Sequence, residues 1–192
     1  SLWRESDFYK AYQGRQIFRV HDAQLRTQGG ELVPVALSCA PLPADQQAMV
    51  VTVLDMSVVR NLHQQLEYQA ITDPLTGLLN RRGFYQAAEG VLLRNERSDK
   101  AQALMYMDLD GFKRINDSLG HPFGDAVLKL ITARLEVSVR EEDTVARLGG
   151  DEFVVLLTGL EGTLEEVISH AGQAAEKLRT LLSEPMLLEG HR

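Results

Sequence analysis

The chain is short of cysteine, of positive charge and of long apolar runs. Its one cysteine, Cys39, cannot form an internal disulfide, so nothing points to an oxidising compartment. Cys39 lies in an apolar run typical of a strand, which predicts a small buried side chain rather than a nucleophile. The longest apolar stretch, near residues 49–54, is too short to cross a bilayer, and the first residues lack the order of a signal peptide. We expect a cytoplasmic domain, and membrane attachment through regions outside these 192 residues stays open.

The charge balance is acidic. There are 20 Lys and Arg residues against 27 Asp and Glu residues, a formal net charge of −7. Such a surface repels phosphate backbones at long range, so we expect no nucleic acid polymer as a partner. A nucleotide site remains compatible with it, because one metal ion and a few cations invert the local field.

The first part of the chain, residues 1–57, is rich in predicted strands, over 15–25, 32–40 and 48–54, the last of them buried. A helix is predicted over 57–70, with apolar residues at Val59, Leu62 and Leu66. Two interpretations of this helix stay open. It is either a short coiled-coil seam or a connector packed on its neighbours.

From residue 71 onward helices and strands alternate, which indicates an α+β or a mixed α/β fold, and we expect α+β. Helices are predicted over 80–94, 122–139 and 163–182, and strands over 101–107, 144–148 and 152–157. The uninterrupted apolar run of 101–107 is typical of a central strand. The last helix is predicted to be capped by Thr163. Its predicted buried face consists of Leu164, Val167, Ile168, Ala171, Ala175, Leu178 and Leu182.

Two acidic motifs follow strands in this second part. Asp108 and Asp110 end one predicted strand, and Asp151 and Glu152 follow the Gly149-Gly150 turn. Oxygen-only sites of this kind suit Mg²⁺, so the pair of motifs indicates metal-assisted phosphoryl transfer. Each motif alone has a plainer interpretation. Gly-Gly-Asp is a common hairpin turn, and Asp-Leu-Asp-Gly could be a capped turn or an incomplete calcium loop.

Four motifs in a fixed order make residues 71–192 resemble the GGDEF family of diguanylate cyclases. They are DPLTGL (73–78) with NRR (80–82), DLDGFK (108–113) with ND (116–117), GH (120–121) with GD (124–125), and RLGGDEF (147–153). The resemblance implies an incomplete palm-like, nucleotidyl-cyclase βααβ core whose active site is a β-hairpin. The hairpin at Gly29-Gly30-Glu31 and the strand through 34–38 similarly make residues 1–57 resemble the C-terminal half of a PAS sensor domain. The expected division is therefore a partial PAS domain over 1–57, a linker or coiled-coil helix over 58–71, and a GGDEF domain lacking its C-terminal part over 72–192.

The resemblance also implies a metal and catalytic site. Asp108, Asp151, Glu152 and the backbone carbonyl of Leu109 would bind Mg²⁺ or Mn²⁺, and Asp151 or Glu152 would help deprotonate a 3′-hydroxyl. Lys113 would act beside them on the phosphates.

The substrate site implied by the resemblance surrounds this metal site. Phe112 would approach the phosphates, while Asn116 and Asp125 would bind guanine and its ribose. Gly149 and Gly150 would leave room for the nucleotide.

Further positions carry weaker expectations. Asp73, Asn80 and Arg81 would fix the connector onto the catalytic fold, and Phe153 would belong to the core. Arg140 and Asp143 match the family's inhibitory product site, where they would bind cyclic di-GMP. A solvated charged stretch is the plainer alternative for that segment.

The implied function is diguanylate cyclase: two GTP molecules, one held by each subunit of a homodimer, condense to cyclic di-GMP and two pyrophosphates. A PAS ligand, which the sequence does not identify, and product feedback would regulate it. The alternatives are a non-catalytic module that senses GTP or cyclic di-GMP, and a structural dimerisation unit. The family also implies a further strand pair and a basic helix after residue 192. We therefore expect these 192 residues alone to be weakly active or inactive.

Overall fold

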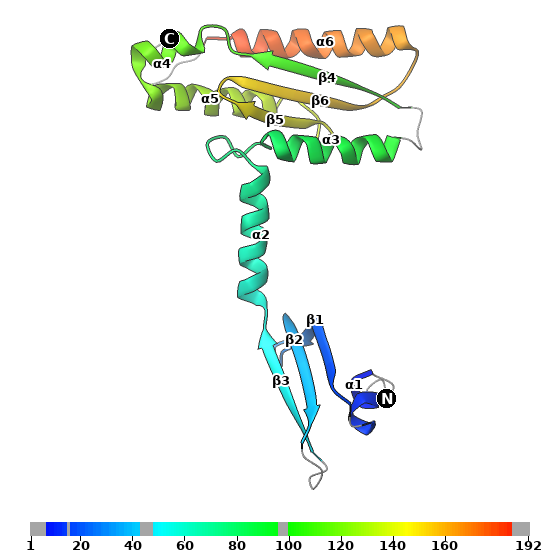
Figure 1. The fold of residues 1–192 in the computed structure, drawn as a ribbon. Coiled ribbons are helices and arrows are strands. Elements are labelled where there is room, and N and C mark those ends of the chain that lie inside the picture. The colour runs from blue at the N-terminus through cyan, green and yellow to red at the C-terminus, as the bar shows by residue number, and fades with distance from the viewer. Residues whose placement is uncertain (1–6, 15, 43–47, 96–99, 186–192) are drawn as a thin grey trace. The chain divides into compact units, whose positions relative to one another are not determined.

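The computed structural model describes residues 7–14, 16–42, 48–95 and 100–185. The chain divides into two compact units, Ser1–Leu66 and Glu67–Arg192. Figure 1 gives the element labels used below. Within the described residues, no helix is both long enough and apolar enough to cross a membrane.

The first unit contains a three-stranded antiparallel sheet. Helix α1 (Asp7–Gln13) precedes β1 (Phe18–Arg26), β2 (Leu32–Pro41) and β3 (Met49–Asp55), in the spatial order β1-β2-β3. Cys39 on the central strand is 1% exposed, which confirms the prediction that it is buried. The prediction of a buried third strand is wrong, because β3 is an edge strand and residues such as Val51 and Leu54 are exposed. The β-branched residues of β3 indicate that this segment forms a strand, but they do not indicate that the strand is buried.

Helix α2 (Ser57–Ile71) has no buried residue. Val59, Leu62 and Leu66 are 54%, 53% and 63% exposed. Both interpretations of this helix, the coiled-coil seam and the packed connector, stay predictions.

The second unit is built on another three-stranded antiparallel sheet. Its elements are α3 (Arg81–Asn95), β4 (Ala101–Asp108), α4 (Phe112–Leu119), α5 (His121–Glu136), β5 (Thr144–Gly149), β6 (Glu152–Leu160) and α6 (Leu164–Ser183). The spatial order is β4-β6-β5, so the prediction of a central strand over 101–107 is wrong among the described strands. The apolar run misleads because residues of β4 alternate between the core and an exposed face, where Leu104 and Tyr106 are 61% and 57% exposed.

Helices cover both faces of this sheet, and Figure 1 shows α3 and α6 on opposite sides of it. Central strand β6 supplies both cores. Phe153 and Val155 pack with α4, α5 and α6, whereas Val154 packs with Phe84 and Val91 of α3. Phe153 is 1% exposed, which confirms it as a core residue. This packing holds the β5–β6 hairpin rigidly from two sides.

The C-terminal helix α6 forms close to its predicted bounds of 163–182. Its burial pattern agrees with the prediction only in part. Thr163 caps the helix, as expected, and the cap is completed as a capping box with Glu166. Val167 and Leu178 are buried, but Leu164, Ile168 and Ala175 are exposed, so the predicted buried face is too wide. A helix packed on one face of a small sheet buries a narrow stripe of its surface.

Candidate active site at the β5–β6 hairpin

The β5–β6 hairpin ends in a tight turn made by Gly150 and Asp151. Gly149 pairs with Glu152 across it, and Gly149 and Gly150 have φ of +146° and +54°. These values favour glycine at both positions. Apart from the residues next to it in the chain, no described heavy atom lies within 4 Å of a Cβ added at either glycine. No other side chain therefore covers the turn at these two glycines, which leaves room for a ligand; we call it the bare turn.

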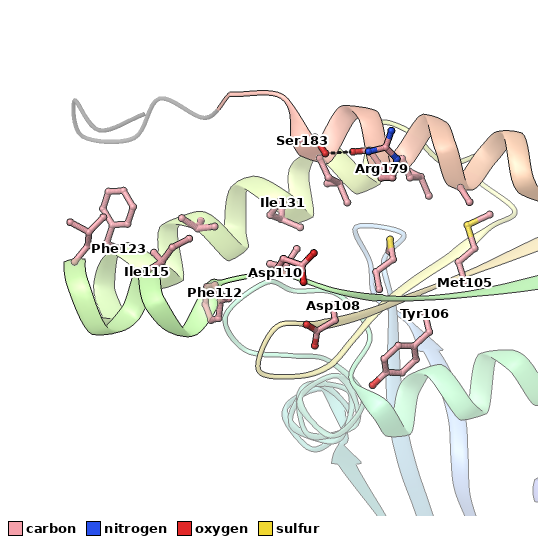
Figure 2. Close-up of a pocket in the computed structure, with 17 residues that line it drawn as sticks. Met105, Tyr106, Asp108, Asp110, Phe112, Ile115, Phe123, Ile131, Arg179 and Ser183 are labelled. Atoms are coloured by element: carbon pink, nitrogen blue, oxygen red, sulfur yellow. Dashed lines mark hydrogen bonds between the residues drawn. The ribbon is translucent and has the colours of Figure 1, made fainter.

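The turn brings the two acidic motifs together. Asp108 at the end of β4 lies opposite Glu152 in the β4–β6 register. The negative charge of Asp151, followed by desolvation and by the charges of Glu152 and Asp110, raises the pKa of Asp108 above its ordinary value. Figure 2 shows Asp108 and Tyr106 on one side of β4, with Met105 on the other. Four carboxylates, from motifs about 40 residues apart in the sequence, therefore lie close enough for their negative charges to interact. A bound cation would reduce this repulsion.

The donor set fits a hard cation held jointly with a ligand. Among the described residues, no three or more Asp, Glu, His or Cys side chains form a ready-made metal cage. Mg²⁺ does not require one, because it is usually bound by one or two carboxylates together with substrate phosphates. The carbonyl oxygen of Leu109 accepts a hydrogen bond from the Phe112 N–H at 3.1 Å and retains a second lone pair.

Two residues that were not expected to belong to the catalytic site, Tyr106 and Arg81, contact Glu152. The Tyr106 hydroxyl is hydrogen-bonded to Glu152, and this bond is the main cause of a raised pKa for Tyr106. Arg81 at the start of α3 lies 3.8 Å from the Glu152 carboxylate. Both contacts help to orient the Glu152 carboxylate. Tyr106 lies two residues before Asp108 on the same strand face, which is the one signal that could have identified it.

Arg147 links this hairpin to residues 72–80, the segment between α2 and α3 that is called the connector below. Its Nη1 donates to Asp73 Oδ1 at 2.9 Å, while Nε and Nη2 donate to the Gly150 carbonyl at 2.9 and 2.6 Å. Burial would raise the pKa of Asp73, but hydrogen bonds from Thr76 and Arg147 outweigh it and hold that pKa below its ordinary value. Asn80 donates to the carbonyls of Ala70 and Thr72, so Asp73 and Asn80 both fix the connector as expected.

The residues expected around the substrate lie on α4 and α5. The Phe112 side chain is buried in the core, whereas Lys113 beside it is exposed, and the approach of Phe112 to the phosphates stays a prediction. Asn116 carries a buried Oδ1 that has no hydrogen-bond partner among the described residues, and Asp125 is exposed. Burying an oxygen without a hydrogen-bond partner costs free energy, so such groups are rare in folded proteins. Where one occurs, a ligand site is a common reason.

The family model described as "Diguanylate cyclase, GGDEF domain" matches residues 70–190. The chain belongs to the GGDEF family. The match covers both acidic motifs, the Arg147 bridge and the helices that carry Asn116 and Asp125.

Similar proteins agree with this assignment. The bifunctional diguanylate cyclase/cyclic di-GMP phosphodiesterase MucR of Pseudomonas aeruginosa is 36% identical over 160 residues, which are 83% of this chain and 22% of MucR. A sensory box/GGDEF family protein of Caulobacter crescentus has a structure with a TM-score of 0.59 at 36% identity, covering 63% of this chain and 75% of that one. The coiled coil and GGDEF domain of DgcB from the same species, in complex with c-di-GMP, has a TM-score of 0.61 at 27% identity, covering 69% and 66%. Among the first curated relatives, the chain spans only 13% to 34% of their length.

A cavity of about 670 Å³ lies behind the acidic end of β4 in this GGDEF domain. Asp108, Leu109 and Asp110 line one part of it, and Figure 2 shows Ile115, Phe123 and Ile131 among its other lining residues. Most of that lining is apolar. The cavity itself is therefore unsuited to a triphosphate, which leaves the bare turn as the polar surface next to the carboxylates.

The residues of the expected inhibitory site lie elsewhere in the domain. Arg140 and Asp143 line a second cavity, of about 940 Å³, together with His170 and Lys177 of α6. Both Asp143 oxygens accept backbone N–H groups, from Arg140 at 3.1 Å and from Thr158 at 3.0 Å. Asp143 thus stabilises its own turn, while the Arg140 side chain is 70% exposed.

Replacing Asp73 by Asn should destabilise the GGDEF domain by roughly 3 kcal/mol, because it leaves the Arg147 guanidinium without its charged partner at a site where both side chains are mostly buried. Arg147→Lys should lower stability similarly, since one ammonium cannot bind Asp73 and Gly150 together. Denaturant unfolding measures both. Glu176→Gln, in the exposed pair with Arg179, is the control and should leave stability unchanged; an equal loss there would contradict the assignment.

Asp108→Asn should raise the melting temperature at pH 7 in metal-free buffer. The pKa of Asp108 is raised in the folded state, so its charge opposes folding above that pKa, and this opposition disappears as the pH falls through it. The gain in melting temperature should therefore vanish in acid. Asp117→Asn, exposed on α4, should behave like the parent.

Proposed function

We propose that the protein is a diguanylate cyclase that condenses two GTP molecules into cyclic di-GMP and two pyrophosphates. The observation that carries the proposal is the convergence of Asp108, Asp151 and Glu152 at a bare two-glycine turn. A domain that only senses nucleotide has no need of all three acids. Membership of the GGDEF family supports the same activity.

In the proposed reaction each 3′-hydroxyl attacks the α-phosphate of the other GTP, loses its proton, and displaces pyrophosphate. Asp108, Asp151 and the Leu109 carbonyl would hold Mg²⁺ or Mn²⁺. When bound, the metal neutralises phosphate charge and lowers the pKa of the attacking hydroxyl. Glu152, held by Tyr106 and Arg81, completes the acidic site, and Lys113 adds positive charge beside the phosphates.

Guanine selection rests on Asn116 and Asp125. A carboxylate at Asp125 accepts from guanine N1 and N2, a donor pair that adenine lacks. The unpaired Asn116 Oδ1 supports a ligand-binding role for this helix pair.

Two GTP molecules on separate subunits require a homodimer. The exposed apolar stripe of α2, at Val59, Leu62 and Leu66, supports the proposal that residues 58–71 form the dimer-controlling linker. The sheet of the first unit supports a partial PAS sensor over residues 1–57, with the GGDEF domain over 72–192. Its ligand is unknown.

Product feedback would act through the second cavity. The exposed Arg140 guanidinium can donate to phosphate or to a guanine edge, and Asp143 holds the turn that presents it. DgcB, the similar protein described above, was solved with c-di-GMP, which supports a product site in this family.

The cyclase is tested by incubating the full-length protein with GTP and Mg²⁺ and separating the nucleotides by chromatography. We expect cyclic di-GMP, and a more than about 100-fold loss of rate in Asp151→Ala, because ligand loss should exceed the effect of losing a supporting contact. GTP binding without product would instead establish a sensing module. No binding of either nucleotide would leave only a dimerisation unit.

Arg140→Ala should relieve product inhibition while leaving the initial rate unchanged, because Arg140 lines a different cavity from the acidic turn. The measurement is the initial rate against added cyclic di-GMP. Glu141→Ala, exposed beside it, is the control. Equal inhibition of Arg140→Ala and the parent would refute the feedback site.

A further inference from the structure

Tyr106 is a large side chain that takes no part in the core. It is 57% exposed, and neither hydrophobic cluster found among the described residues includes it. Residues two apart on a strand point to the same face, and Figure 2 shows Tyr106 and Asp108 on one side of β4. Core packing therefore does not account for a tyrosine at this position, and the contact made by its hydroxyl becomes the informative one.

The hydroxyl reaches Glu152 diagonally across the sheet. Tyr106 lies opposite Val154 in the β4–β6 register and Asp108 lies opposite Glu152, so Tyr106 and Glu152 are diagonal neighbours on one face. Long side chains at diagonal positions can meet. The Tyr106 hydroxyl is hydrogen-bonded to Glu152. A carboxylate accepts such a bond, so the hydroxyl is the donor.

Arg81 cannot fix Glu152 in the same way. Its Nη2 lies 3.8 Å from Glu152 Oε2, a distance that gives charge attraction but is too long for a hydrogen bond. The charges of Asp151 and Glu152 both act on Asp108, and this repulsion pushes the Glu152 carboxylate away from Asp108. The bond from Tyr106 opposes that displacement, because a hydrogen bond has a defined length and direction.

We propose that Tyr106 is a positioning residue of the acidic site: its hydroxyl holds the Glu152 carboxylate beside Asp108 and thereby sets the affinity of the site for Mg²⁺ or Mn²⁺. The inference rests on the proposed function. A carboxylate has about four lone-pair positions, so the bond to Tyr106 leaves others for a metal ion. Losing a hydrogen bond that orients a metal ligand costs roughly 10- to 100-fold in metal affinity.

The test measures Mn²⁺ binding to the full-length protein through the loss of the electron paramagnetic resonance signal of the free ion. Each titration contains 3′-deoxy-GTP, which lacks the attacking hydroxyl. Tyr106→Phe keeps the ring and removes only the hydroxyl, and we expect it to bind Mn²⁺ about tenfold more weakly than the parent. Its rate of cyclic di-GMP formation should fall at low metal concentration and recover at saturating metal, because only the metal affinity changes.

Two further variants separate positioning from a general disturbance of the sheet. Tyr85→Phe makes the same change on an exposed tyrosine of α3 and should leave Mn²⁺ binding unchanged. In a Glu152→Ala background, Tyr106→Phe should cause no further loss of Mn²⁺ binding, because the hydroxyl acts through the carboxylate that is no longer present.

Three results overturn the inference alone: Mn²⁺ binding by Tyr106→Phe equal to that of the parent, a further loss in the Glu152→Ala background, or a rate that saturating metal does not restore. A parent protein that binds neither Mn²⁺ nor 3′-deoxy-GTP overturns the proposed function, and this role of Tyr106 with it.

Discussion

The Arg147 guanidinium is the contact on which the geometry of the candidate site depends. It binds Asp73 in the connector and the carbonyl of Gly150 in the catalytic turn, and it is only 10% exposed. Gly149 and Gly150 beside and within the turn have no side chains that could brace it, and both have positive φ. The planar Arg147 guanidinium, with its five N–H donors, therefore fixes the position of the segment around Asp73. It also fixes the positions of Asp151 and Glu152. A displacement of the connector would reach the acidic turn through this side chain.

Much of the fold and of the candidate site could be predicted from the sequence, because the motifs carry their own local structure. Gly149-Gly150 predicts a hairpin turn, Thr163 predicts a helix cap, and both form as expected. The proximity of Asp108 to Asp151 followed from the family resemblance, and the β4–β6 register explains it physically. These successes share a cause: each depends on residues close in sequence or on adjacent strands.

The parts that could not be predicted depend on contacts between distant residues. Asp73 and Arg147 lie 74 positions apart, and no local pattern pairs them. The apolar runs of β3 and β4 predicted burial and a central position, yet composition does not report which strand lies at an edge. The bond between Tyr106 and Glu152 likewise joins two strands that are far apart in the sequence. Tertiary contacts thus decide how the recognisable motifs are oriented for chemistry.

The most direct test of the account is a crystal structure of the protein with 3′-deoxy-GTP and Mn²⁺, located by anomalous scattering. The analogue lacks the attacking hydroxyl and so cannot react. We predict Mn²⁺ in direct coordination with Asp108 and Asp151, triphosphate over the bare Gly149-Gly150 turn, and guanine between Asn116 and Asp125. Nucleotide bound only beside Arg140, with no metal at the acidic turn, would contradict it.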